Sequence, residues 1–220
     1  MSLSKVIELA RGELGVSEFP PGSNRVKYWD LYDPAYQGQP WCVSFLWWCF
    51  NEAGERMSFF GGGKTASCGI LLRWYKEQGL VATVQSAQIG DIIILNFSGT
   101  TDTQHCGLVV DVAKNDKGGL RYMQTIEGNT SPSIEGSQNN GGCVALKWRH
   151  YSQVVGVCRP QYREDDFVDD ISGHWAEKEM RWAAEKGLIK GYSDGTMKPD
   201  KPITRAELAV ILKRLEDGRE

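Results

Sequence analysis

GDIIILNF, at residues 90–97, and HCGLVVDV, at residues 105–112, open the series of short segments that decides the fold. The segments are rich in β-branched residues, and Gly, Asn and Asp separate one from the next, which is typical of β-strands joined by turns. The series continues at residues 119–128, 143–151 and 154–159. We therefore predict an antiparallel sheet in this part of the chain.

Helices are predicted ahead of these strands. Residues 4–14 carry apolar side chains at helical spacing and are followed by Gly15, a residue type that commonly ends a helix. Two further helices are expected at residues 41–54 and 67–78. Because the helices come first and the strands afterwards, we predict an α+β fold in which N-terminal helices pack on the antiparallel sheet.

The length and composition indicate two domains. The chain has 220 residues, of which 41% are hydrophobic and 24% are charged, as in an ordinary globular protein. This length accommodates one full domain and a small one. The polar, acid-rich segment RPQYREDDFVDD, at residues 159–170, has the composition of a linker. We therefore predict a first domain at residues 1–162 and a second at residues 163–220, with the linker at about residues 160–168.

Charge and hydropathy argue against two classes of partner. A net charge of -3 argues against a nucleic-acid-binding surface. The apolar runs at residues 43–50 and 92–97 are far shorter than the roughly 18 residues of a membrane span. The N-terminal segment contains Glu8 and Glu13, so we expect an amphipathic helix there rather than a secretory signal.

The C-terminal domain is predicted to be a small all-α helical pair. Its helices are expected at residues 175–186 and 205–215, and Thr204 with Glu207 forms a capping box at the start of the second. A pair this small buries little surface alone. We expect it to pack against its neighbouring domain or against copies of itself.

The six cysteines lack any CxxC pair, so free thiols are the main expectation and disulfides or a metal site the alternatives. Cys42 is the strongest nucleophile candidate, because the dipole at the start of a helix favours a thiolate. Cys68, also near a helix start, is its rival, and Cys49 is expected to be packing. The strand cysteines are expected to act as small apolar residues, namely Cys106, Cys143 and Cys158.

A thiol nucleophile needs a base, and the sequence offers three histidines. His105 begins a predicted strand, from where its side chain can reach a cleft, whereas His150 and His174 lack such a position. Glu127 and Asn129 stand at the end of the next strand and could orient the imidazole. The alternative for this segment is an ordinary polar turn.

Three features occur together and in order, namely PWCVSFLWWCFNEAG (40–54), GDIIIL with QHCGLVV (90–110) and IEGN (126–129). Over roughly residues 4–160 the chain resembles the CHAP family of cysteine amidohydrolases and peptidases, especially its phage-lysin members. The resemblance implies a papain-like α+β fold in which Cys42 attacks, His105 is the base, and Glu127 and Asn129 orient or polarise. Gln37 and Gln39 are both open as oxyanion donors beside the Cys42 N–H. The chain departs from the family pattern in having Cys106 directly after His105.

The tail resembles one S-layer homology repeat, with GYSDGT (191–196) and ITRAE (203–207) as its most specific motifs. This resemblance implies binding of a secondary cell-wall polymer. Trp175 is a candidate for stacking on a sugar, with core packing as the alternative. Arg205 is a candidate for pairing with a carboxylate, with a plain surface position as the alternative.

Such repeats commonly combine in threes, so a homotrimer through the tail is hypothesised. Its contact would be an apolar stripe made of Met180, Ala183, Ala184, Ile189, Leu208, Ile211 and Leu212.

Together the two resemblances imply a peptidoglycan hydrolase, an endolysin or autolysin that needs no metal or organic cofactor. It would cut either the N-acetylmuramoyl-L-alanine amide or a peptide bond. We expect it to be made in the cytoplasm and to act at a Gram-positive wall after holin-type release or lysis. Two alternatives are a wall-polymer-binding protein with an inactive hydrolase fold and an intracellular thiol amidohydrolase.

Overall fold

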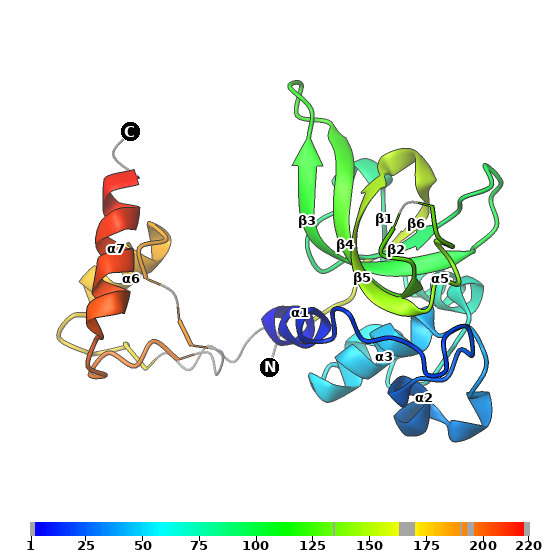
Figure 1. Ribbon diagram of the computed structural model, residues 1–220. Coiled ribbons are helices and arrows are strands. Elements are labelled where there is room, and N and C mark those ends of the chain that lie inside the picture. The colour runs from blue at the N-terminus through cyan, green and yellow to red at the C-terminus, as the bar shows by residue number, and fades with distance from the viewer. Residues whose placement is uncertain (1–2, 134, 163–169, 190, 193–195, 218–220) are drawn as a thin grey trace. The chain divides into compact units, whose positions relative to one another are not determined.

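The computed structural model describes residues 3–133, 135–162, 170–189, 191–192 and 196–217 (Figure 1). The chain divides into two compact units, residues 2–163 and residues 164–220. Most of the predicted linker at about residues 160–168 lies outside the described residues, as does part of the GYSDGT motif.

The first unit is a mixed helical and β structure. Its helices are α1 (Leu3–Gly12), α2 (Lys27–Tyr32), α3 (Cys42–Glu52), α4 (Arg56–Phe60) and α5 (Cys68–Glu77), with 3-10 turns at Pro34–Tyr36, Val84–Ser86 and Tyr151–Gln153. Its strands are β1 (Val81–Ala82), β2 (Ile92–Leu95), β3 (His105–Lys114), β4 (Leu120–Thr130), β5 (Cys143–His150) and β6 (Val154–Cys158). Among the described residues these strands form one sheet in the order β1-β6-β2-β3-β4-β5, and every neighbouring pair is antiparallel. The predicted α+β class is confirmed.

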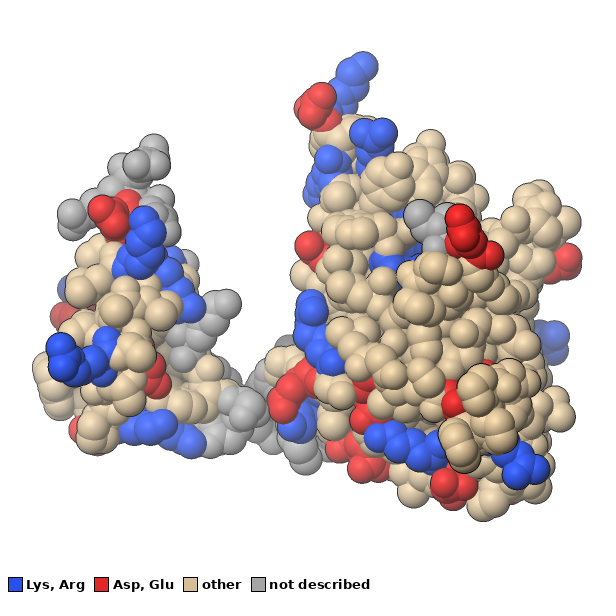
Figure 2. Space-filling model, in the orientation of Figure 1, with Lys and Arg blue, Asp and Glu red and all other residues tan. Residues whose placement is uncertain are grey.

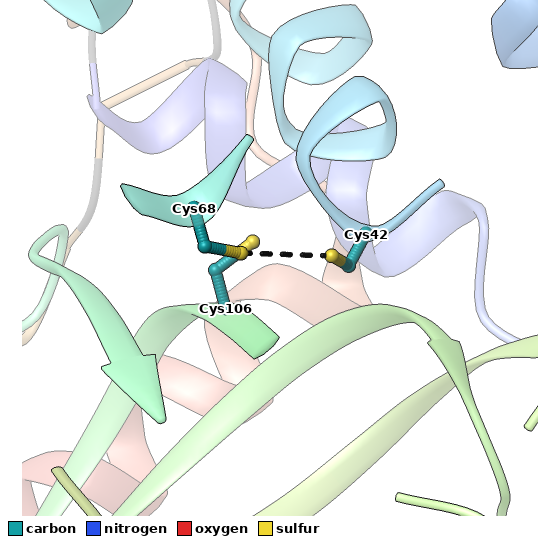
Figure 3. Close-up of side chains that lie close together, drawn as sticks. All are labelled: Cys42, Cys68 and Cys106. Carbon is teal, nitrogen blue, oxygen red and sulfur yellow. Dashed lines mark hydrogen bonds between the residues drawn. The ribbon is translucent and has the colours of Figure 1, made fainter. Parts of the chain in front are cut away.

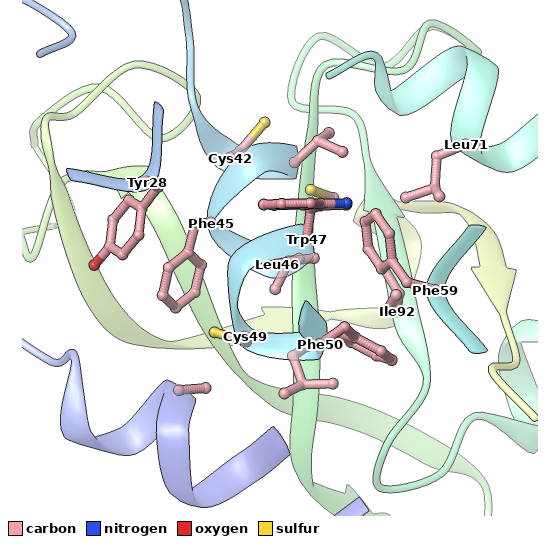
Figure 4. Close-up of a cluster of buried hydrophobic side chains, with 14 of the residues drawn as sticks. Tyr28, Cys42, Phe45, Leu46, Trp47, Cys49, Phe50, Phe59, Leu71 and Ile92 are labelled. Carbon is pink, nitrogen blue, oxygen red and sulfur yellow. The ribbon is translucent and has the colours of Figure 1, made fainter. Parts of the chain in front are cut away.

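Helix α3 is the centre of the larger core. Its residues 43–50 are almost all apolar, and a helix that is apolar on all sides is stable only when it is buried on all sides. Phe45, Leu46 and Phe50 lie within the buried cluster drawn in Figure 4, together with Phe59 and Ile92. This packing fixes the N-terminus of α3, and Cys42 with it.

Strand β2 is buried on both faces of the sheet, which explains its continuous apolar run. Ile92 and Ile94 belong to the core that contains α3, whereas Ile93 and Leu95 belong to a second, smaller core. Alternate side chains of a strand point to opposite faces, so IIIL supplies both cores from one strand.

Two glycines allow close packing within the first unit, one between β4 and α3 and the other between β3 and a side chain of β4. A Cβ at Gly128 of β4 would lie 2.6 Å from Cβ of Phe45, so only glycine lets β4 run this close to α3. A Cβ at Gly107 of β3 would lie 2.7 Å from Cγ of Glu127. Gly107 therefore leaves the space that the Glu127 side chain occupies.

The second unit contains α6 (Glu177–Glu185) and α7 (Arg205–Asp217). The capping box is confirmed, because Glu207 N–H donates to Thr204 Oγ1 at 3.2 Å and Thr204 N–H donates to Glu207 Oε2 at 2.8 Å. Exposed apolar side chains remain on this unit, among them Trp182, Leu208 and Leu212.

On the face in Figure 2, acidic and basic side chains of the described residues are interspersed over the first unit. Within the described ranges, every helix is too short or too polar to cross a bilayer.

Candidate active site

Cys42 is the first residue of α3 and lies in the core with 6% of its surface exposed. Trp41, the residue before it, is held by its indole N–H, which donates to Glu18 Oε1 at 3.1 Å. The position at a helix start favours a negative charge on sulfur. The thiols of Cys106 and Cys68, which can donate to a Cys42 thiolate, and His105 nearby lower the pKa of Cys42 well below its usual value.

His105 begins β3, where its side chain is fully buried. Its Nε2 lies 3.0 Å from Glu127 Oε2, and its Nδ1 forms no hydrogen bond with the residues that the structure describes. Burial alone would lower the pKa of His105, but the interactions with Cys42 and Glu127 outweigh burial and raise this pKa to about 9. Since Nε2 is occupied by Glu127, Nδ1 is the ring nitrogen available to the Cys42 thiol.

Glu127 is held by a second cation, Arg149 of β5, which sequence reasoning missed. Arg149 Nε donates to Glu127 Oε1 at 2.7 Å and its Nη2 donates to Oε2 at 2.5 Å. Thr125 Oγ1 donates to the same Oε1 at 2.5 Å. Burial would raise the pKa of Glu127, but Arg149 and His105 lower it to about 2. Glu127 is therefore an anion that both cations hold in place.

The sequence pattern that could have revealed Arg149 is the alternation of apolar and charged residues in CVALKWRHY, at residues 143–151. Leu146 and Trp148 are exposed, whereas Lys147 and Arg149 between them are buried. Charged side chains on the buried face of a strand need partners of opposite charge. Recognising which face was buried would have directed attention from Arg149 to Glu127.

Asn129, expected to orient or polarise His105, forms its hydrogen bonds with loop residues instead. It has a φ of 57°, and its amide nitrogen donates to Asn24 Oδ1 at 3.2 Å and to Asn140 Oδ1 at 3.0 Å. Its amide oxygen accepts the Gly142 N–H at 3.3 Å. These bonds tie two loops to the end of β4, whereas the partner of His105 is Glu127.

The two glutamines differ as candidate oxyanion donors. The side-chain nitrogen of Gln37 already donates to the Val26 carbonyl at 2.9 Å and to Asp30 Oδ1 at 3.0 Å. Gln39 is exposed. The backbone N–H of Cys42, at the first helical position, has no acceptor within its own helix.

All six cysteines, each within the described residues, carry free thiols. The structure brings Cys42 and its rival Cys68 together, with their sulfur atoms 3.8 Å apart. Cys106, expected to be a small apolar residue, lies in the same cluster. Burial and the neighbouring thiols raise the pKa of Cys106. The thiol of Cys106 acts to lower the pKa of Cys68, but Cys42 and burial together outweigh it, so the pKa of Cys68 is raised. Cys42 is thus the thiol of this cluster that ionises most readily.

The candidate residues of the second unit lie on its surface. Trp175 is 88% exposed, so it does not pack into the core of the described unit. Arg205 is exposed at the first position of α7. Both side chains are accessible to a ligand.

Two known family profiles match the chain, one within each unit. Residues 34–129 match the family profile described as the CHAP domain, and residues 169–209 match that of the S-layer homology domain. The chain thus carries a CHAP domain followed by an S-layer homology domain.

Known proteins are similar to parts of the chain. Cell surface glycoprotein 1 of Acetivibrio thermocellus is 54% identical over 46 residues, which are 21% of this chain and 2% of that protein. The cellulosome-anchoring protein of the same organism is 50% identical over 52 residues, 23% of this chain and 12% of that protein. The chain therefore spans only a small share of these relatives. A crystal structure of the wild-type endolysin LysIME-EF1 aligns with 74% of this chain and 66% of its own, with 18% identity and a TM-score of 0.44.

Proposed function

We propose that the protein is a peptidoglycan hydrolase that cuts an amide bond by cysteine nucleophilic catalysis and is held at the cell wall by its S-layer homology domain. The observation that carries the proposal is the buried line of groups from Cys42 through His105 to Glu127. A thiol at a helix start beside an imidazole, which in turn bonds a carboxylate, is the arrangement that activates a cysteine nucleophile.

In the proposed mechanism Cys42 Sγ, as thiolate, attacks the carbonyl carbon of the scissile amide. The carbonyl oxygen becomes an oxyanion, for which the Cys42 backbone N–H is a donor. His105 then gives its Nδ1 proton to the leaving amine, and the C–N bond breaks to leave a thioester on Cys42. A water attacks this thioester while His105 takes one of its two protons, the C–S bond breaks to re-form the thiolate, and the carboxylic acid product leaves and ionises in solvent.

Glu127 and Arg149 are positioning residues in this mechanism. The Glu127 carboxylate accepts the Nε2–H of His105, which turns Nδ1 toward Cys42 and stabilises the imidazolium. Arg149 keeps Glu127 ionised in a buried site. Asn129 supports the end of β4 by joining two loops to it.

Wall attachment is proposed for the second unit, through a secondary cell-wall polymer. The similarity to segments of a cell surface glycoprotein and a cellulosome-anchoring protein supports a role at the cell surface. Trp175 offers an exposed ring for a sugar face, and Arg205 offers a guanidinium for a carboxylate. Attachment would concentrate the hydrolase on its substrate.

A trimer through the second unit is part of the proposal. Its apolar stripe includes Leu208 and Leu212, which are 46% and 56% exposed. Three further residues of the stripe, Met180, Ile189 and Ile211, line a groove of about 420 Å³ on the same unit. Exposed apolar surface of this kind favours association with further copies. Light scattering should give three times the chain mass at micromolar concentration, and a monomer would contradict the trimer.

The test of the function uses purified Gram-positive walls and the full chain. Mass spectrometry of the digested walls identifies the new ends, since an amidase frees the sugar lactyl group from L-alanine whereas an endopeptidase frees a new amine within the peptide. Either set of ends supports the proposal. Walls that bind the protein and gain no new ends would contradict it and leave wall binding alone.

A further inference from the structure

Three thiols from three separate elements meet in the first unit (Figure 3). Cys42 begins α3, Cys68 begins α5, and Cys106 lies on β3. Their sulfur atoms all lie within 4.8 Å of one another, and all three side chains are buried. The proposed hydrolysis needs only one of the three as nucleophile. Cys68 and Cys106 support the Cys42 thiolate in that mechanism, but neither of them reacts with the substrate.

The spacing of the sulfur atoms fits a single metal ion. Zinc binds thiolates at about 2.3 Å, so two sulfurs on one tetrahedral zinc are about 3.8 Å apart. The sulfur atoms of Cys42 and Cys68 are already separated by 3.8 Å. Sulfur ligands select thiophilic ions such as Zn²⁺ over Ca²⁺ and Mg²⁺, which prefer oxygen.

The charges around the cluster also fit a cation bound to thiolates. Cys42 and Cys68 are the first residues of helices of 11 and 10 residues, so two positive helix ends converge on the sulfurs. Three buried thiolates without a counter-ion would repel one another. A divalent ion neutralises two of these charges, and the helix ends help to offset the third.

We propose that Cys42, Cys68 and Cys106 form a binding site for a thiophilic divalent cation, best matched by Zn²⁺, and that the bound ion inhibits the enzyme by occupying the Cys42 thiolate. Each ligating thiol gives up its proton when the ion binds, and a chelator that removes the ion returns Cys42 for attack. Binding stands on the geometry alone, whereas inhibition rests on the proposed hydrolase function.

The binding test titrates the metal-free full chain with Co²⁺, whose bonds to sulfur produce a charge-transfer absorption band. We expect a band that saturates at one ion per chain and disappears when Zn²⁺ is added. Cys68→Ala should weaken Co²⁺ binding at least about 10-fold, because even the loss of an outer-shell partner costs about that much. Cys49→Ala, which removes a buried thiol of α3 outside the cluster, is the matched control and should bind as the wild type does. Absence of the band in the wild type, or unchanged binding by Cys68→Ala, would overturn the site.

If Cys68→Ala does not fold, a second measurement on the wild type tests whether the three thiols bind the ion. In the wild type, Zn²⁺ should protect Cys42, Cys68 and Cys106 from alkylation in urea too dilute to unfold the protein, whereas Cys143 should be alkylated at the same rate with and without the ion. Mass spectrometry of the peptides gives these rates. Equal alkylation of the three clustered thiols with and without Zn²⁺ would overturn the proposal.

The activity test separates this site from the hydrolase function. Zn²⁺ should stop wall lysis by the wild type, and a chelator should restore it. Lysis by Cys68→Ala is compared with the rate of the same variant without zinc. Its inhibition should require a Zn²⁺ concentration at least about 10-fold higher than inhibition of the wild type. Lysis by the metal-free protein without any cobalt–sulfur band would contradict the metal site alone. A cobalt–sulfur band in a metal-free protein that does not lyse walls would contradict the hydrolase and support the site.

Discussion

Nε2 of His105 lies 3.0 Å from Oε2 of Glu127, and neither side chain is accessible to solvent. In such a place the carboxylate fixes which ring nitrogen faces Cys42 and stabilises the positive charge on the ring. The proposed catalytic arrangement therefore depends on Glu127 as well as on the thiol.

Glu127→Gln should lower the rate of wall lysis by about 10²- to 10⁴-fold, because the imidazolium loses its charged partner. The alkaline fall in lysis should also move to lower pH, because His105 without its charged partner loses its proton more readily, which a purely structural change would not cause. Glu77→Gln, at an exposed position of α5, is the control and should leave both unchanged. Full activity of a folded Glu127→Gln protein would contradict the assigned role.

Arg149→Met should destabilise the first unit by about 3–5 kcal/mol, because it removes one of the two cationic partners of the buried Glu127 carboxylate. Urea unfolding followed by circular dichroism measures this change. Arg121→Met removes an exposed guanidinium from β4 and should change the free energy of unfolding by less than about 0.5 kcal/mol. Similar values for the two variants would contradict the buried ion pair.

The pH dependence of lysis follows from the two shifted groups. The pKa of Cys42 is lowered, so its thiolate forms below the usual range, and the pKa of His105 is raised to about 9, so its imidazolium persists up to that pH. Both charged forms coexist between these limits. In buffer containing a chelator, lysis should stay level through neutral pH and fall above about pH 9. A fall centred near the ordinary histidine value of about 6.5 would be inconsistent with the pair.

Trp175→Ala and Arg205→Ala should each weaken binding to purified walls by about fivefold, the equivalent of about 1 kcal/mol. Cosedimentation measures the binding, and cleavage of small soluble wall fragments should not change. Trp182→Ala removes another exposed indole, 51% exposed on α6, and should bind normally. Equal losses for the two tryptophan variants would argue against a specific contact at Trp175.

Much of the first unit could be predicted because its local patterns are strong. The apolar run that ends at Gly54 predicts the buried helix α3, and the β-branched segments predict β2 to β6. The short helices α2 and α4, of 6 and 5 residues, were missed because they contain too few turns to establish a period. Helix α1 ends at Gly12 rather than at Leu14, since residues 13–15 form a turn.

Residues of the candidate site could be predicted only where a reactive side chain stands at or near the end of a helix or strand. Cys42 and His105 each begin an element, and Glu127 lies near a strand end, so each could be selected from its position. Arg149 was missed because its bond to Glu127 joins residues 22 positions apart on neighbouring strands. The meeting of Cys42 with Cys68 and Cys106 depends on how two helices pack against the sheet, which no local pattern specifies.

The central claim is that Cys42 is the nucleophile of a wall hydrolase, and Cys42→Ala tests it most directly. Turbidity of purified Gram-positive walls should fall with the wild type and with the control Cys49→Ala, and should stay constant with Cys42→Ala, which still cosediments with the walls. Clearing of the walls by Cys42→Ala at the wild-type rate would contradict the account.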